Sequence, residues 1–241
     1  MTGSKEQSLL GRIVHELRHH APFTFIGTLV GIGVILAVVY GHIEHHVSEM
    51  LFGVFHPLHV LLSAIVTTAM YRLYGGGPAQ RPRLWAAILV GYVGAIGIGT
   101  VSDSLIPFLG ETLLGAHDPH VHAEHAHIGF IDLWWLVNPL ALAGVAIGYL
   151  WPRTRIPHAG HVLLSTAASL FHMSMALEHG VGVWTVVGLT AFLFLAVWLP
   201  CCTSDIVWPL LFVGKGKRPP CSHCHGEASE AAQPQGEQSP T

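Results

Sequence analysis

The stretch HPLHVLLS at residues 56–63 returns as HAGHVLLS at residues 158–165, an offset of 102. A second stretch, SDSLIPFL at residues 102–109, returns as SDIVWPLL at residues 204–211, at the same offset. Two separate blocks that keep their polar residues in one register are hard to obtain by accident in a hydrophobic chain. We interpret them as the duplication of a unit of three helices.

The composition indicates a membrane protein. Of 241 residues, 51% are hydrophobic and 10% are charged, and the mean hydropathy is +0.52, whereas an ordinary soluble domain is about one quarter charged. A helix needs roughly 20 mostly apolar residues to span a bilayer. Six segments qualify by this criterion: 22–41, 51–73, 84–109, 131–151, 159–178 and 183–213. They are too continuously apolar for barrel strands, so the predicted fold is an all-α integral membrane protein.

The basic residues set the predicted orientation. All eleven Lys and Arg lie on one side of this topology: Arg72 is at the end of the second segment, and the other ten precede the first segment, follow the sixth, or lie between the second and third or the fourth and fifth. By the positive-inside rule, both termini are cytoplasmic. No cleavable signal sequence is recognisable, because a largely polar stretch precedes a full-length span. We therefore expect a multi-pass protein of the cell's inner (plasma) membrane.

Because three is an odd number, the second copy would enter the membrane from the opposite side. The six helices are therefore expected to form two inverted three-helix repeats, an architecture of secondary transporters in which the binding site lies between the repeats on interrupted helices. Pro107 and Pro209 predict interruptions in the long third and sixth helices, because proline removes a backbone donor. The expected divisions are an N-terminal cytoplasmic segment (1–21), repeat 1 (22–110), an extracytoplasmic His-rich loop (111–130), repeat 2 (131–213) and a disordered cytoplasmic tail (214–241).

The two repeated blocks also carry candidate metal ligands. In HxxH on a helix the two imidazoles share one face, and neutral imidazoles are common transition-metal ligands. An aspartate deep in a membrane helix is retained only with partners or for a function. We expect an outer cluster and an inner cluster, with one further histidine nearer the outer side. The candidates are His56, His59 and Asp103 outside; His158, His161, Asp205, Cys201 and Cys202 inside; and His172.

Further histidines and cysteines lie outside the predicted spans. A histidine-rich outer loop is typical of metal capture, and the CSHCH motif of the tail (residues 221–225) offers thiols and an imidazole. The accessory capture residues are therefore His42, His45, His46, His117, His120, His122, His125, His127, Cys221, Cys224 and His225.

These features predict a carrier rather than an enzyme. The expected substrate is a divalent transition-metal ion such as Zn, Ni, Co or Fe(II), moved by alternating access. The histidines of the outer loop favour uptake over export. No Gly-rich phosphate loop is present, so ATP is not expected to drive transport. The expected partners are the lipid bilayer and metal ions, with a homodimer left open and nucleic acid excluded.

The alternative is an intramembrane metalloenzyme or a b-type haem redox protein that uses the same histidines. HIEHH (residues 42–46) is similar to one histidine box of the membrane di-iron desaturases and hydroxylases. Such enzymes need several more boxes that converge on one face, whereas the other histidines here are divided between two sides. Haem itself is not expected. A b-type haem near the inner side would need an opposing histidine from a second helix, but near its inner end the second segment offers Met70 and no histidine.

Overall fold

The computed structural model describes residues 9–41, 45–75, 83–114, 128–152, 155–176 and 182–212. Every regular element in these ranges is helical, in agreement with the all-α prediction. The elements are α1 (Leu9–Tyr40), α2 (His45–Gly75), α3 (Leu84–Thr100), the π-helical turn η1 (Val101–Leu105), α4 (Ile106–Leu113), α5 (Gly129–Asp132), α6 (Trp134–Leu150), α7 (Arg155–Ala176), α8 (Val183–Cys202), the π-helical turn η2 (Thr203–Val207) and α9 (Trp208–Leu211).

Among the described residues, three helices are long and apolar enough to cross a membrane. They cover His46–Leu73, Leu84–Leu113 and Val183–Cys201, and shorter apolar helices cover Thr24–Val34 and Trp134–Leu150. Large apolar side chains such as those of Ile26, Trp134 and Trp184 are exposed, whereas Ser63 and Asp103 are fully buried. An apolar surface around a polar interior suits a protein surrounded by lipid, so we treat the chain as a membrane protein. That α1, α6 and α7 also cross the membrane remains a prediction.

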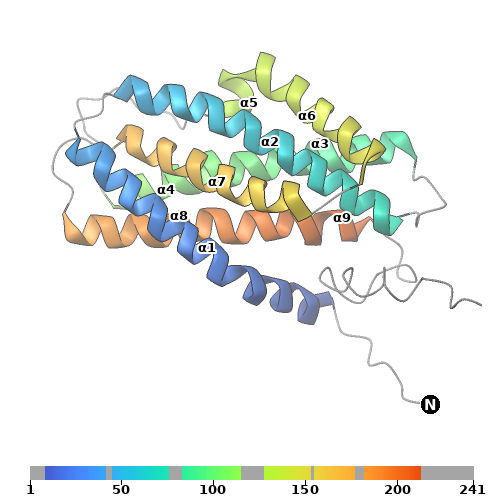
Figure 1. The fold of residues 1–241 in the computed structure, drawn as a ribbon, viewed down its shortest axis with the longest axis horizontal. Helices are drawn as coiled ribbons and strands as arrows, with labels where there is room; N and C mark the ends of the chain where they lie inside the picture. Colours follow the sequence, from blue (N-terminus) through green and yellow to red (C-terminus); the bar gives the residue numbers. More distant parts are fainter. Residues whose placement is uncertain are drawn as a thin grey trace, which may run out of the picture.

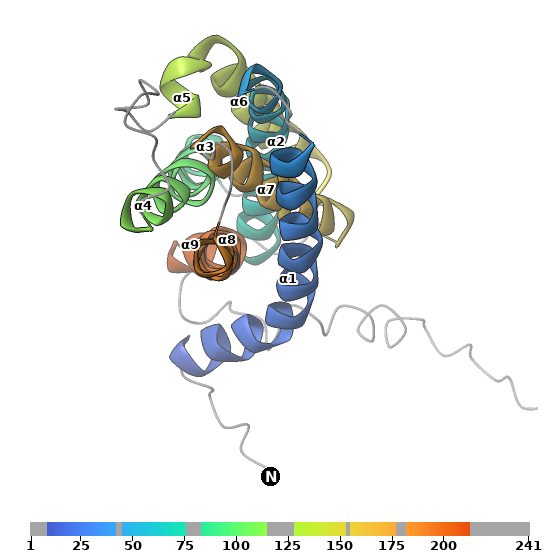
Figure 2. The same ribbon diagram turned by 90° about the vertical axis from the view of Figure 1, so that its left-hand side faces the viewer.

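The helix α7 lies beside α2 in the middle of the molecule (Figures 1 and 2), and these two helices are in close contact. The colours of Figure 1 show that the two run in opposite directions. The helix α6 packs on α2 and α3, while α1 packs on α7 and α8. Each half of the chain therefore places its HxxH helix at the centre, against the HxxH helix of the other half.

The predicted interruptions of the third and sixth helices take the form of π-helical turns. The turns Val101–Leu105 and Thr203–Val207 are related by the same offset of 102 residues as the sequence blocks. In the first turn the N–H of Ile106 donates to the carbonyl of Val101, five residues back. Pro107 and Pro209 are each the second residue after the end of their turn. The helices thus continue through a wide turn rather than breaking, and such turns are frequent at functional sites.

Each π-helical turn is held by a hydroxyl from the other half of the chain. Ser169 on α7 donates from Oγ to the carbonyl of Ser102 at 3.0 Å. Thr67 on α2 donates from Oγ1 to the carbonyl of Ser204 at 3.4 Å. Thr67 and Ser169 are 102 residues apart, as are Ser102 and Ser204. The two halves therefore exchange equivalent hydrogen bonds.

Two glycines allow α6 to approach the backbone of α2. A Cβ atom at Gly144 would lie 2.5 Å from the carbonyl oxygen of Leu61, and one at Gly148 would lie 2.4 Å from that of Ile65. Small residues four apart are a common means of close helix packing in membranes. At the end of α6, Arg72 donates to the carbonyls of Tyr149 and Leu150. These contacts hold α6 against α2.

We expect Gly148→Ala to lower the melting temperature of the detergent-solubilised protein clearly. The new methyl group would clash with backbone atoms, which cannot move to another rotamer as a side chain can. Overpacking of this kind costs about 1–3 kcal/mol. Gly97→Ala on α3 is the matched control, because no atom lies within 4 Å of its new Cβ. The control should melt at or above the wild-type temperature, since alanine is the better helix former by about 1 kcal/mol. Equal melting temperatures for the two variants would contradict this packing.

Candidate metal centre

The carboxylate of Asp103 is the centre of a buried hydrogen-bond network. It lies in the π-helical turn η1 and has no exposed surface. Its Oδ2 atom is 2.9 Å from Nδ1 of His56 and 2.5 Å from Nδ1 of His59. Its Oδ1 atom accepts from the hydroxyls of Ser102 at 2.7 Å and Ser165 at 3.1 Å. Four donors thus surround one carboxylate, and their hydrogen bonds compensate for its removal from water.

This network determines which imidazole nitrogens are able to bind a metal. An ionised carboxylate only accepts hydrogen bonds, so His56 and His59 must each donate from Nδ1–H. In the neutral imidazole the lone pair is then on Nε2. The Nε2 atoms of His56 and His59 are buried and have no hydrogen-bond partner among the described residues. A carboxylate that orients a histidine from behind is the usual second shell of a metal site.

A group of possible metal ligands meets this hydrogen-bond network at His59. The imidazole of His161 on α7 stacks against that of His59 on α2, with ring centroids 4.7 Å apart and an angle of 12° between the planes. Ligand-type atoms of His59, His161 and Cys201 lie within 4.8 Å of one another, as do those of His56, His59 and Asp103. All five residues are buried. The two groups therefore share His59 and form one continuous centre.

No known protein identifies this centre. No protein-family model, curated protein or solved structure matches the chain. The chemistry of the centre is therefore interpreted from its own residues.

The centre is tightly enclosed on the side of His56. The ring of Phe52, one turn earlier on α2, stacks on His56 with centroids 5.2 Å apart. A Cβ atom at Gly129, the first residue of α5, would lie 2.2 Å from Cδ2 and 2.4 Å from Nε2 of His56. Only glycine allows the backbone to lie so close to the imidazole. The start of α5 therefore covers His56 at the point where the chain leaves the histidine-rich loop.

His172 belongs to a separate buried pair. Its Nδ1 atom lies 3.0 Å from Oε1 of Glu111 on α4, and both side chains are almost fully buried. The ring of Phe52 lies edge-on to His172, at 5.5 Å between centroids. His172 therefore lies near the centre, as expected for a residue three turns beyond His161, but outside both ligand groups found among the described residues.

The structure differs from the expectation of two separate clusters. It brings His56, His59 and Asp103 together, as their depth along the helices suggests. His161 and Cys201, however, lie beside His59 rather than in a separate inner cluster. The reason is that α2 and α7 pack against each other, so that their histidines meet at one level.

The structure leaves other candidates undescribed. His46 is exposed near the start of α2. The side chains of His45, His158, Cys202 and Asp205 lie outside the described part, although their backbone is helical. The following candidates lie entirely outside the described residues: His42, His117, His120, His122, His125, His127, Cys221, Cys224 and His225.

Sequence reasoning missed three contributors to the site. The predicted extracytoplasmic loop (111–130) begins at Glu111, but α4 extends to Leu113 and the side chain of Glu111 is buried. Its spacing of eight residues from Asp103 was a usable signal, since it places both on one face of a regular helix. Phe52 was signalled by its position four residues before His56. Nothing in the sequence around Gly129 indicates its contact with His56.

Proposed function

We propose that this chain is a secondary carrier for a divalent transition-metal ion in the cell's inner membrane. Its six apolar segments would form two inverted three-helix repeats, with both termini in the cytoplasm. The single observation that carries the proposal is the buried group of His59, His161 and Cys201, which lies where the two halves of the chain meet. Asp103 orients His59 from the opposite side of the ring.

Three features support the inverted repeat. The π-helical turns share the sequence offset, the hydroxyls of Thr67 and Ser169 make equivalent bonds to opposite halves, and the central helices α2 and α7 run in opposite directions (Figure 1). A two-fold axis in the membrane plane would produce all three. In carriers of this architecture the substrate lies at the interface between the repeats, which is where the candidate centre is located.

The donor atoms favour a particular class of ion. Two imidazoles and one thiol form a set that suits Zn, Co, Ni or Fe(II), whereas Mg and Ca prefer oxygen ligands. Three protein ligands also leave a coordination position open on a tetrahedral ion. An ion with an open coordination position can be released, as the substrate of a carrier must be.

The division of the ligands between the halves provides a means of release. His59 and Asp103 belong to the first half, whereas His161 and Cys201 belong to the second. A movement of α7 relative to α2 would separate the stacked imidazoles and dismantle the ligand group. Alternating access would thus couple exposure of the centre to loss of affinity. We propose uptake as the direction, with the histidine-rich outer loop raising the local concentration of the ion.

Proteoliposomes that contain a metal-sensitive dye test the proposal directly. We expect the wild-type protein to admit Zn or Co in the absence of ATP, and Cys201→Ser to lower the apparent affinity at least tenfold. Even loss of an outer-shell partner typically costs about 10–100-fold in affinity, and loss of a direct ligand should cost no less. Normal flux in folded Cys201→Ser protein would show that the thiol is not a ligand. Absence of flux in the wild type would overturn the proposal that the chain is a carrier.

The visible spectrum of the purified protein separates the carrier from the alternative function. A Soret band would favour a b-type haem protein over a carrier. The stacked arrangement of His59 and His161 argues against haem at this point, because the two axial histidines of a haem face each other across the macrocycle. We expect no Soret band and a transition metal in elemental analysis.

A further inference from the structure

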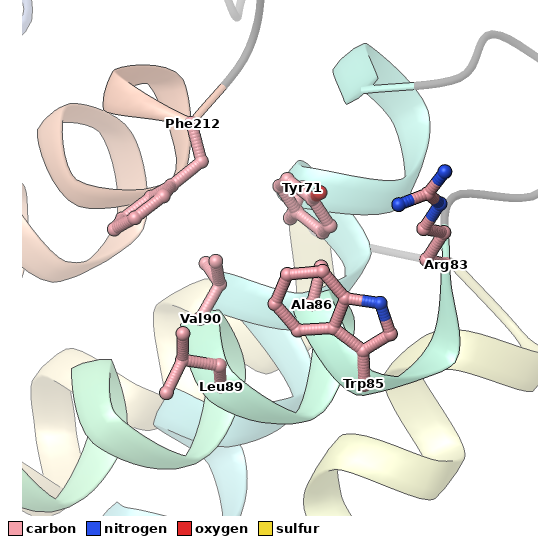
Figure 3. Close-up of a pocket in the computed structure, with 7 residues that line it drawn as sticks. All are labelled: Tyr71, Arg83, Trp85, Ala86, Leu89, Val90 and Phe212. Carbon is pink, nitrogen blue, oxygen red and sulfur yellow. The ribbon is translucent and has the colours of Figure 1, made fainter.

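A pocket separate from the metal centre lies between the two halves of the chain. It has a volume of about 450 Å³ and is lined by Tyr71 at the end of α2, by residues at the start of α3 and by Phe212 just beyond α9. Figure 3 shows Arg83 and Phe212 on opposite sides of the pocket, with Tyr71 between them. The pocket is large enough for part of an organic ligand, whose sites typically measure about 300–1,000 Å³.

One side of the pocket is polar. The guanidinium group of Arg83 is exposed, and among the described residues neither it nor the Tyr71 hydroxyl has a hydrogen-bond partner or an oppositely charged neighbour. The side chain of Tyr71 is only 8% exposed. The pair therefore offers a positive charge and a donor to a ligand that carries a negative charge.

The other side of the pocket is apolar and open. Trp85, Leu89 and Phe212 are 62%, 47% and 46% exposed, and all three line the pocket. The helix α3, which carries two of them, is part of a segment long and apolar enough to cross a membrane. An exposed tryptophan beside the first residue of such a helix is typical of the membrane interface, where an aromatic ring meets both headgroups and acyl chains.

The position of the pocket selects the leaflet. Arg83 lies between the second and third predicted spans, on the side that carries all eleven Lys and Arg. By the positive-inside rule this is the cytoplasmic side. Anionic lipids give the cytoplasmic leaflet a negative surface, and basic pockets between membrane helices on this side bind anionic headgroups.

We propose that this pocket binds one anionic phospholipid of the cytoplasmic leaflet. Its phosphate would accept from Arg83 and Tyr71, and the first part of one acyl chain would lie along Trp85, Leu89 and Phe212. Tyr71 and Arg83 belong to the first half of the chain and Phe212 to the second. The bound lipid therefore contacts both halves and favours the arrangement in which these residues lie close together. This site does not depend on the proposed transport function.

Native mass spectrometry of the full chain tests the lipid site. We expect the wild-type protein to retain phosphatidylglycerol about fivefold more strongly than phosphatidylcholine with the same acyl chains, the contribution of one basic residue near a membrane surface. Arg83→Gln should remove this preference. Arg18→Gln is the matched control, because Arg18 is also exposed, on α1, and does not line the pocket. It should keep the preference.

The remaining outcomes are also decisive. Trp85→Ala should weaken retention of both lipids, since it removes the contact to the acyl chain. Inorganic phosphate should not displace phosphatidylglycerol, and if it does, the pocket binds a small anion rather than a lipid. Equal retention of the two lipids by the wild type overturns the proposal. Equal losses in Arg83→Gln and Arg18→Gln overturn it as well, because the preference then comes from general surface charge.

Discussion

Asp103→Asn is expected to lower the affinity for Zn or Co by about 10–100-fold, the usual loss when an outer-shell partner of a metal ligand is removed. The amide keeps the shape of the carboxylate but replaces one acceptor oxygen with an NH₂ group. It therefore cannot accept from His56 and His59 together with Ser102 and Ser165. At least one imidazole loses its orientation and its fixed tautomer. Isothermal titration of the metal-depleted protein measures the change directly.

Ser104→Ala is the matched control for Asp103→Asn. Ser104 lies in the same π-helical turn, is fully buried, and its hydroxyl has no hydrogen-bond partner among the described residues. Removal of a buried hydroxyl that lacks a partner is nearly neutral or stabilising. We therefore expect unchanged metal affinity and an equal or higher melting temperature. If folded Asp103→Asn protein binds Zn as the wild type does, Asp103 does not orient the ligands.

His59→Ala should abolish metal binding, and its effect should exceed that of His56→Ala. His59 is a member of the ligand group of His59, His161 and Cys201, whereas His56 is linked to that group only through the hydrogen-bond network of Asp103. Loss of His59 leaves the group with two ligands, while loss of His56 leaves His59, His161 and Cys201 in place. Elemental analysis gives the metal content per chain. With Co²⁺, the thiolate-to-cobalt charge-transfer absorption reports separately whether Cys201 is a ligand.

Leu58→Ala is the control on the same helix. Leu58 is adjacent to His59 but is exposed and has no ligand atom, so its loss should leave the metal content and the charge-transfer absorption unchanged. The melting temperature shows whether His59→Ala remains folded, because its loss also removes the stacking against His161. A folded His59→Ala protein with one bound metal and the full absorption would show that His59 is not a ligand.

The sequence predicts well that His56, His59 and Asp103 lie close together, because local rules determine this grouping. Helical periodicity places His56 and His59 on one face, and their depth along α2 resembles that of Asp103 in its helix. The same rules place His161 on a helix face but do not say which neighbour that face meets. The two copies were therefore expected to use their own ligands. Packing of α2 against α7 instead brings His161 to His59, which depends on the tertiary fold.

The local sequence likewise predicts where the helices are interrupted, but not the form that the interruptions take. Pro107 and Pro209 correctly mark where the regular hydrogen bonding changes, because each proline lacks an N–H group. They do not specify how the backbone adapts. In the structure the helix takes one additional residue into a turn, which becomes π-helical, and then continues. Glu111 is carried inward on this continuation, and a prediction that ended the third span at residue 109 did not reveal its burial.

Gly99 and Cys201 occupy equivalent positions in the two halves, 102 residues apart. A Cβ atom at Gly99 would lie 3.1 Å from Cγ2 of Val60, 3.9 Å from Cε1 of His56 and 4.0 Å from Cε1 of His59, so one half has no side chain beside its imidazoles where the other has a thiol. The proposed centre therefore has a soft ligand that only the second half supplies. A thiol binds a polarisable ion better than a hard one. Ions of equal charge and similar radius would thus be distinguished by their polarisability rather than by their size.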